Sequence, residues 1–122
     1  MTLEQEEITK EIIGAAFEVH RVLGYGFLEK VYQRAMQVEL INRGLLAELE
    51  EPIKVRYKGV VVGDYEADIF VEKGVIVELK IAKLYCPEDE AQILNELKAT
   101  GIKVGLLINM GREKVEFKRL VF

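Results

Sequence analysis

The chain has 122 residues, of which 50% are hydrophobic and 31% are charged, a composition typical of one globular domain. It contains one cysteine and one histidine, which excludes an internal disulfide and a zinc site of the Cys/His type. No apolar run approaches the length of a membrane span, and the first residues are acidic where a signal peptide would be basic. We therefore expect a single domain over residues 1–122, located in the cytoplasm and without a membrane partner.

The net charge of −4 is unevenly distributed along the chain. The first 97 residues hold 11 Lys or Arg and 19 Asp or Glu, whereas the last 25 hold six and two. Phosphate contacts supply most of the non-specific affinity for nucleic acid, so an acidic chain is a poor passive binder. A nucleic-acid partner would need the basic C-terminal part of the chain or metal ions that neutralise the carboxylates.

Two helices are expected first. Apolar residues recur at helical spacing near the N-terminus, which predicts a helix over about residues 3–22. The Gly-Tyr-Gly sequence at residues 24–26 ends this helix. A second helix is predicted over about residues 27–43, and Gly44 is well placed as its C-terminal cap.

Three strands are expected next. Alternation of apolar and charged residues predicts a strand over about residues 53–57. Lys58-Gly59 makes a tight turn into a long strand over about residues 60–72, and residues 72–74 turn again into Val75–Lys80. Turns this short indicate an antiparallel meander of three strands.

One more helix and two more strands complete the chain. Pro87 opens a helix over about residues 88–100, and Gly101 closes it. Residues 103–109 are nearly all apolar, which is typical of a strand covered on both faces, and a last strand is predicted over about residues 115–121. The order ααβββαββ predicts an α/β fold, an α+β mixed sheet flanked by helices.

The meander contains candidate functional residues. Strand alternation points Asp68, Glu78 and Lys80 to one face, and a compatible turn register would place Asp68 beside Glu78. The apolar side of the second strand is expected to point to the other face, with Tyr65, Ala67, Ile69 and Val71. Neighbouring carboxylates repel unless a proton or a cation lies between them, and Mg²⁺ suits such a pair. The alternative interpretation is an ordinary solvated sheet face.

These residues resemble a known signature. Asp68 followed by Glu78-Leu79-Lys80 is similar to the D-x(n)-(D/E)-x-K signature of the PD-(D/E)XK nuclease superfamily. Residues 26–32, Gly-Phe-Leu-Glu-Lys-Val-Tyr, resemble the G-x-x-E-x-x-Y motif that names the GxxExxY branch of that superfamily. The resemblance spans nearly the whole chain in the right order. It implies a restriction-endonuclease-like core, αβββαβ, with an extra N-terminal helix and a C-terminal strand.

The resemblance also implies a catalytic site for Mg²⁺ or Mn²⁺. Asp68 would be the central metal ligand and Glu78 the second. Glu29 would be an extra acidic ligand from the second helix, and the backbone carbonyl of Leu79 would face the ion. Lys80 would position the attacking water or help to activate it.

Further residues extend this implied site or depart from the family pattern. Gln92 would approach the site from the third helix. Tyr25 stands where the family usually has proline, Glu96 where a tyrosine commonly follows the glutamine, and Met110 where an aromatic residue is usual. Glu96 lies one helical turn past Gln92 and adds negative charge, which bears on how a substrate is handled.

Two residues near the motif have two interpretations each. His20 is either a partly buried, hydrogen-bonded residue or a wall of the site that holds Glu29 or a phosphate. Tyr32 lies one turn after Glu29, which favours a core or supporting position over a catalytic one.

Three functions are compatible with the sequence. The first is a Mg²⁺-dependent nuclease that hydrolyses phosphodiester bonds, of DNA rather than RNA, with a homodimer as one way to hold a duplex. The second is a catalytically inert nuclease-fold binding or assembly module, since the chain is small, acidic and without a recognition domain. The third is an anion- or nucleotide-handling enzyme, although neither a P-loop nor a G-x-G-x-x-G motif is present.

Overall fold

The computed structural model describes residues 2–84 and 86–122. The helices are α1 (Thr2–Leu23), α2 (Glu29–Asn42) and α3 (Pro87–Thr100). The strands are β1 (Ala47–Tyr57), β2 (Val60–Val71), β3 (Val75–Lys80), β4 (Val104–Asn109) and β5 (Glu116–Val121). Within these residues no helix is both long and apolar enough to cross a membrane.

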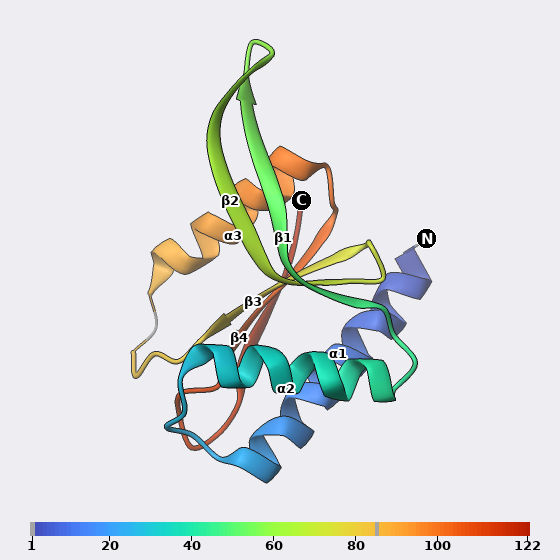
Figure 1. Ribbon diagram of the computed structural model, residues 1–122, viewed down its shortest axis with the longest axis vertical. Helices are drawn as coiled ribbons and strands as arrows, with labels where there is room; N and C mark the ends of the chain where they lie inside the picture. Colours follow the sequence, from blue (N-terminus) through green and yellow to red (C-terminus); the bar gives the residue numbers. More distant parts are fainter. Residues whose placement is uncertain (1, 85) are drawn as a thin grey trace.

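The five strands form one mixed sheet in the order β1-β2-β3-β4-β5. β3 and β4 are parallel, and all other neighbours are antiparallel. The parallel pair requires a crossover, which α3 supplies. The predicted order ααβββαββ and the three-stranded meander are therefore confirmed (Figure 1).

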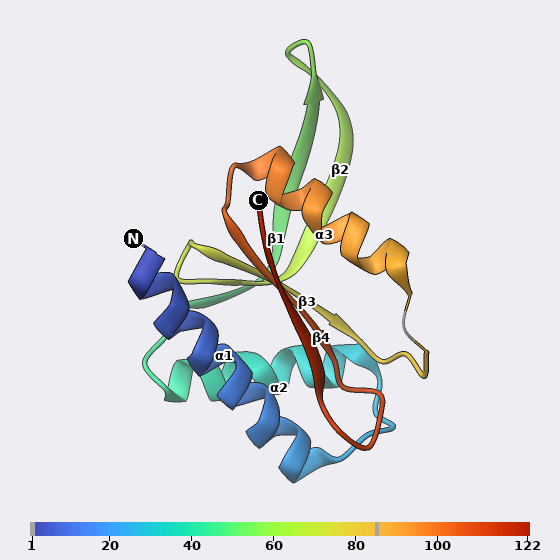
Figure 2. The ribbon, with the colours of Figure 1, turned by 180° about the vertical axis from the view of Figure 1, so that it is seen from behind.

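The helices bury apolar residues on both faces of the sheet (Figure 2). On one face α1 and α2 pack against β3 and β4, with Tyr32 and Met36 fully buried. On the other face Ile93 and Leu97 of α3 pack against Ile76 of β3. β3 and β4 are thus covered on both sides, and for β4 its nearly all-apolar sequence predicts this.

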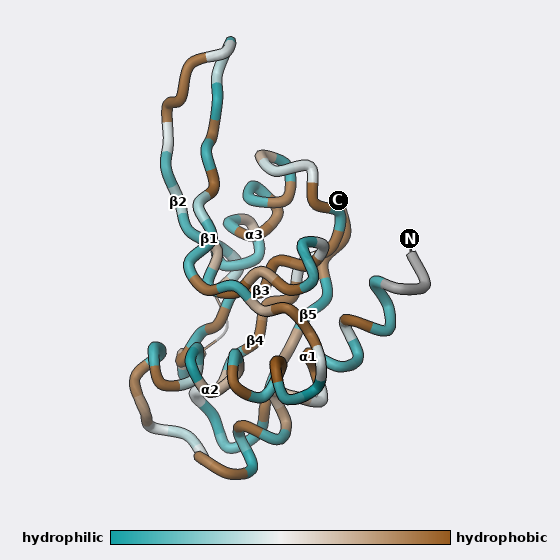
Figure 3. Tube along the Cα trace, turned by 45° about the vertical axis from the view of Figure 1, so that its right-hand side comes forward, coloured by the Kyte–Doolittle hydropathy of each residue, from teal (hydrophilic) through white to brown (hydrophobic). Residues whose placement is uncertain are grey.

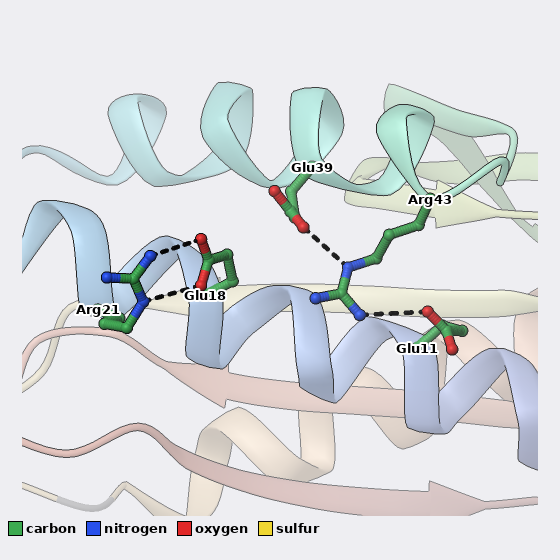
Figure 4. Close-up of polar contacts among 5 residues, drawn as sticks. All are labelled: Glu11, Glu18, Arg21, Glu39 and Arg43. Atoms are coloured by element: carbon green, nitrogen blue, oxygen red, sulfur yellow. Dashed lines mark hydrogen bonds and ion pairs between the residues drawn. The ribbon is translucent and has the colours of Figure 1, made fainter.

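An arginine joins α1 to α2 (Figure 4). Arg43, just after α2, lies 2.9 Å from the Glu39 carboxylate through Nε and 3.2 Å from the Glu11 carboxylate through Nη1. A Cβ at Gly14 would lie only 2.9 Å from Arg43 Nη1. Glycine at this position therefore leaves the space that the guanidinium needs to reach across α1.

Two sequence-based predictions about the meander are wrong. β1 begins at Ala47 and not at residue 53, because its first half pairs with the inner part of β2. Strict alternation also fails along β2: Ala67 packs with the cluster under α3, whereas Ile69 packs with the cluster under α1 and α2. Between these residues the ladder skips the position where Glu50, with φ 56°, lies across from Asp68. The left-handed conformation of Glu50 twists β1 locally, and β2 twists with it, so that Ala67 and Ile69 face different clusters.

Beyond the sheet, β1 and β2 continue as a two-stranded arm, residues 52–66, which projects from the body (Figures 1 and 3). Lys58 and Gly59 form its turn with φ values of 49° and 84°, as a type I′ hairpin requires. The register shifts between Val55 and Arg56. Figure 3 shows hydrophobic stretches along the arm.

Candidate active site

The site lies where β2 and β3 separate. Their ladder ends at Ile69 opposite Val77, and Asp68 and Glu78 follow on the two strands. The Asp68 N–H donates to Glu78 Oε2 at 3.1 Å, and the Leu79 N–H donates to Asp68 Oδ2 at 2.7 Å. Two side-chain carboxylates thus replace the ladder hydrogen bonds. The register that the sequence analysis required for this juxtaposition is present.

Strand geometry places the Leu79 carbonyl on the same edge. The N–H and C=O of one strand residue point to the same neighbour, and the Leu79 N–H faces Asp68. The carbonyl oxygen of Lys80 instead accepts a hydrogen bond from the Met110 N–H, on the β4 side. The edge of β3 that faces the carboxylates therefore presents the Leu79 oxygen.

Lys80 provides the cation of the site. Its Nζ lies 3.6 Å from Asp89 Oδ1 in the first turn of α3, and its side chain is about one quarter exposed. The positive charge of Lys80 also lowers the pKa values of Glu29 and Asp68, against the effect of burial. Lys80 therefore lies on the face that the sequence analysis predicted.

Glu29 reaches the cluster from the first residue of α2. Its carboxyl group contacts that of Asp68, and this contact raises the pKa of Glu29 in addition to the larger effect of burial. Gln33, one turn further along α2, donates from Nε2 to the Asp68 carbonyl at 2.8 Å. The hydrogen bond ties α2 to β2 and fixes where the helix begins relative to the carboxylates.

Tyr32 supports the loop that precedes Glu29. Its hydroxyl donates to the Gly24 carbonyl at 2.7 Å and accepts from the Phe27 N–H at 3.3 Å. The side chain is fully buried, which favours the supporting interpretation. His20 Nε2 lies 2.7 Å from the Arg112 carbonyl oxygen, so the geometry favours its structural interpretation as well.

α3 adds a fourth carboxylate. Glu96 is 3% exposed and contacts Glu78, and Gln92 Nε2 donates to Glu96 Oε2 at 3.2 Å. Within the described part of the chain, Glu96 Oε1 is buried without a hydrogen-bond partner. Gln92 thus reaches the acidic cluster through Glu96. We call Glu29, Asp68, Glu78 and Glu96 the acidic cluster.

Burial is the main cause of raised pKa values in the acidic cluster. The pKa of Glu78 rises to about 9, because burial and then the charges of Asp68 and Glu96 oppose its ionisation. The pKa values of the other three members shift in the same direction. Such a cluster favours binding of protons or a cation.

The cluster fits a hard divalent cation by its chemistry. All of its side-chain donors are carboxylate oxygens, the ligands that Mg²⁺ and Mn²⁺ prefer, and Glu96 Oε1 has an unused lone pair in the interior. Over residues 2–84 and 86–122, no three Asp, Glu, His or Cys side chains converge into a ready-made metal site. Coordination by this cluster would therefore involve small rotations of its side chains.

The sequence analysis missed two residues of the site, Asp89 and Gln33. Asp89 lies three residues before Gln92, and Gln33 lies four residues after Glu29. Helical spacing places each on the same side of its helix as the predicted residue. That spacing was the available signal.

β2 and β3 separate at two carboxylates, Asp68 and Glu78, and Lys80 lies two residues after Glu78. Together with a mixed sheet that has helices on both faces, this arrangement defines a restriction-endonuclease-like fold. The family model described as PD-(D/E)XK nuclease superfamily matches residues 6–120, so the chain belongs to this superfamily. The predicted fold class and superfamily are confirmed.

A solved structure named "Crystal structure of SSO0001" has a similar fold, with a TM-score of 0.55 and 17% sequence identity. The similarity covers 98% of this chain and 60% of that chain. This protein therefore spans somewhat more than half the length of the chain in that structure. No curated protein sequence matches the chain significantly.

Proposed function

We propose that the protein is a metal-dependent nuclease that hydrolyses phosphodiester bonds, with DNA rather than RNA as its substrate. The observation that carries the proposal is the reciprocal arrangement in which Asp68 and Glu78 each accept a backbone N–H at the split between β2 and β3. Strand backbone fixes both carboxylates, and Lys80 follows on the same face. Sites that stabilise developing charge need this kind of prior positioning.

The acidic residues of the site would hold the ion. Asp68, Glu78, Glu29 and the Leu79 carbonyl are the proposed ligands for Mg²⁺ or Mn²⁺. A bound divalent cation supplies Lewis-acid polarisation of the phosphate and stabilises negative charge in the transition state. The raised pKa of Glu78 supports the assignment, because a cation would replace the proton that burial favours.

Lys80 is proposed to orient the attacking water or the phosphate. Its ammonium group has three donors and no acceptor, and the ion pair with Asp89 keeps Nζ at the mouth of the cluster. A compact cation beside the reacting phosphate attracts the phosphate oxygens. The same ammonium group can donate a hydrogen bond to the oxygen of the attacking water and so orient it.

We also propose that the chain belongs to the GxxExxY branch. The support is structural: Tyr32 holds the loop at Gly24 and Phe27, and Glu29 follows directly at the start of α2. The tyrosine and the glutamate of the motif thus act together, since Tyr32 supports the loop that leads into Glu29.

An inert binding or assembly module is the second candidate. Two observations favour it: Asp89 already neutralises Lys80, and Glu96 places additional negative charge beside Glu78. Both features would disfavour an approaching phosphate in the absence of a cation.

Labelled single- and double-stranded DNA and RNA, incubated with Mg²⁺, Mn²⁺ or EDTA, test the proposal. We expect cleavage with either metal and none with EDTA. Asp68→Asn, which keeps an oxygen acceptor for the Leu79 N–H, should abolish cleavage. Absence of cleavage of every substrate by the wild type would favour the inert module.

A further inference from the structure

A groove runs between the arm and α3, beside the acidic cluster. Its volume is about 840 Å³. The arm contributes residues of β1 and β2, and α3 contributes one side along about three turns. The side chains used in the argument below are Lys54, Arg56, Tyr65, Gln92, Asn95 and Lys98. Figure 2 shows α3 beside the base of the arm.

The groove is lined by three cationic side chains, Lys54, Arg56 and Lys98, and by two acidic ones, Glu88 and Glu96. Arg56 comes from the arm and Lys98 from α3, and neither has an ion-pair partner among the residues that the structure describes. Lys54 pairs with Asp64 across the arm at 2.5 Å. Two opposed walls therefore carry free positive charge, an arrangement suited to a phosphate backbone.

The groove also offers surfaces for bases. Tyr65 is 52% exposed and lines the groove from β2, and Ile53 and Val55 form an apolar wall beside it. Asn95 and Gln92 provide amide donors and acceptors from α3. Cations that follow the backbone, together with an exposed aromatic ring for stacking, are the features by which proteins bind single strands.

The groove meets the acidic cluster at Glu96. Glu96 and Gln92 line the groove, and Glu96 contacts Glu78. A strand lying between the arm and α3 would therefore pass beside Glu96, which contacts Glu78 in the acidic cluster. The volume is in the range of clefts that bind small ligands, roughly 300–1,000 Å³.

We infer that the groove between the arm and α3 binds single-stranded nucleic acid and guides it to the acidic cluster. The inference rests on the proposed nuclease function, because guiding a strand to the acidic cluster presupposes cleavage there. Binding in the groove can be measured separately from cleavage. Arg56 and Lys98 would contact phosphates, and Tyr65 would stack on a base.

Fluorescence anisotropy of labelled oligonucleotides in EDTA tests the inference without cleavage. The protein carries Asp68→Asn, with Lys80→Ala as a second inactive background if the first fails to fold. Single-stranded DNA and RNA of about 12 nucleotides, a duplex of the same sequence and unlabelled polyglutamate are compared. We expect single strands to bind more tightly than the duplex, and polyglutamate to compete poorly.

Substitutions then locate the binding surface. Tyr65→Ala should weaken single-strand binding about 5- to 100-fold, as the loss of one stacked base does. Arg56→Ala and Lys98→Ala should each weaken binding and reduce the slope of log K against log salt by about 0.7. Tyr57→Ala at the tip of the arm and Lys114→Ala after β4 are exposed matched controls and should bind as the parent protein does.

Three outcomes would overturn the inference: groove variants that bind like the controls, a duplex that binds as tightly as a single strand, or effective competition by polyglutamate. Circular dichroism of each variant confirms folding. If the wild type cleaves nucleic acid while the groove variants bind normally, only this inference fails. If the groove binds single strands and the wild type cleaves nothing, only the proposed nuclease function fails.

Discussion

At the scale of residues, the site consists of acids that the fold removes from water and fixes through the main chain. Asp68 and Glu78 are each held by a backbone N–H, so their positions depend on strand geometry and not on other side chains. Lys80 is held by a single ion pair with Asp89 at 3.6 Å. The main chain therefore sets where the two acids lie, whereas the position of the lysine depends on another side chain.

Lys80→Ala is expected to lower the cleavage rate by about 10²-fold or more, as removal of one charge-stabilising group does. A protonated lysine cannot ligate a metal ion, so metal binding should persist or increase slightly as like-charge repulsion is removed. Asp68→Ala and Glu78→Ala should lose both properties. Calorimetric titration with Mn²⁺ and a gel assay measure the two effects.

Lys83→Ala is the matched control, because Lys83 is an exposed lysine in the segment that follows β3. It should retain both cleavage and metal binding. If Lys80→Ala cleaves as fast as the wild type, the assignment of Lys80 is wrong even for a functional nuclease.

The raised pKa of Glu78 predicts a pH dependence of stability. With a pKa of about 9 in the folded protein against 4.5 ordinarily, the folded state retains a proton that the unfolded chain releases. The metal-free protein should therefore lose stability as the pH rises from about 4.5 towards about 9. Burial is the main cause, and the nearby charges of Asp68 and Glu96 add to it.

Urea unfolding in EDTA at about pH 5.5 and about pH 8 measures this dependence. Glu78→Gln should flatten it and should be more stable than the wild type at the higher pH. Glu7→Gln, at an exposed position of α1, should leave the dependence unchanged. Wild-type stability that rises over this interval would contradict the prediction.

At the scale of elements, the sequence predicted helices and strands well where glycine or proline marks their ends and apolar residues recur at regular spacing. β3 has the predicted bounds, Val75–Lys80, and Gly101 ends α3 in the left-handed conformation. The start of β1 was not predicted, because the short alternation of residues 47–50 breaks at Glu51 and Pro52, and this segment becomes a strand by pairing with β2. Long-range pairing decides such segments, and local propensity does not.

The candidate site was predictable to a similar extent. A short turn and strand alternation suffice to bring Asp68 beside Glu78. The contacts of Gln33, Asp89 and Glu96 depend on how α2 and α3 lie across the sheet, which helical periodicity alone does not give. Strand patterns in the sequence therefore predict the carboxylate pair more readily than the helix residues that surround it.

Gly111→Ala should destabilise the protein and disturb the site. A Cβ at this position would lie 2.7 Å from the Ile81 Cα and 2.8 Å from its carbonyl oxygen. These are backbone atoms directly after Lys80 and cannot rotate away, so β3 or the loop after β4 must shift. We expect a loss of about 1–3 kcal/mol in the free energy of unfolding, measured in urea, together with reduced cleavage.

Gly63→Ala in the arm is the matched control. Its added Cβ would lie 3.4 Å from the Tyr65 ring and 3.5 Å from the Val55 Cβ, and alanine suits a strand at least as well as glycine does. Equal free energies of unfolding for the two variants would contradict the prediction, because they would show that the loop after β4 can move without destabilising the protein.

At the scale of the whole molecule, the fold separates support from recognition. α1 and α2 bury the larger apolar cluster on one face, and the opposite side presents the arm, α3 and the groove between them (Figure 1). The groove places two cations that lack an ion pair among the described residues, Arg56 and Lys98, near the acidic cluster. A homodimer and a cytoplasmic location stay predictions.

A divalent cation is expected to stabilise the whole molecule, because binding to the folded state relieves repulsion within the acidic cluster. At an ion concentration of 100 Kd the gain is about 2.7 kcal/mol, or roughly 10 °C in Tm for a domain of this size. Thermal melts in Mg²⁺ or Mn²⁺ against EDTA measure it. The Tm of Asp68→Asn should rise much less on addition of the ion. The Tm of Asp64→Asn, which removes an exposed carboxylate of the arm, should rise as much as that of the wild type. An equal rise in Asp68→Asn and the wild type would mean that the ion binds elsewhere on the molecule.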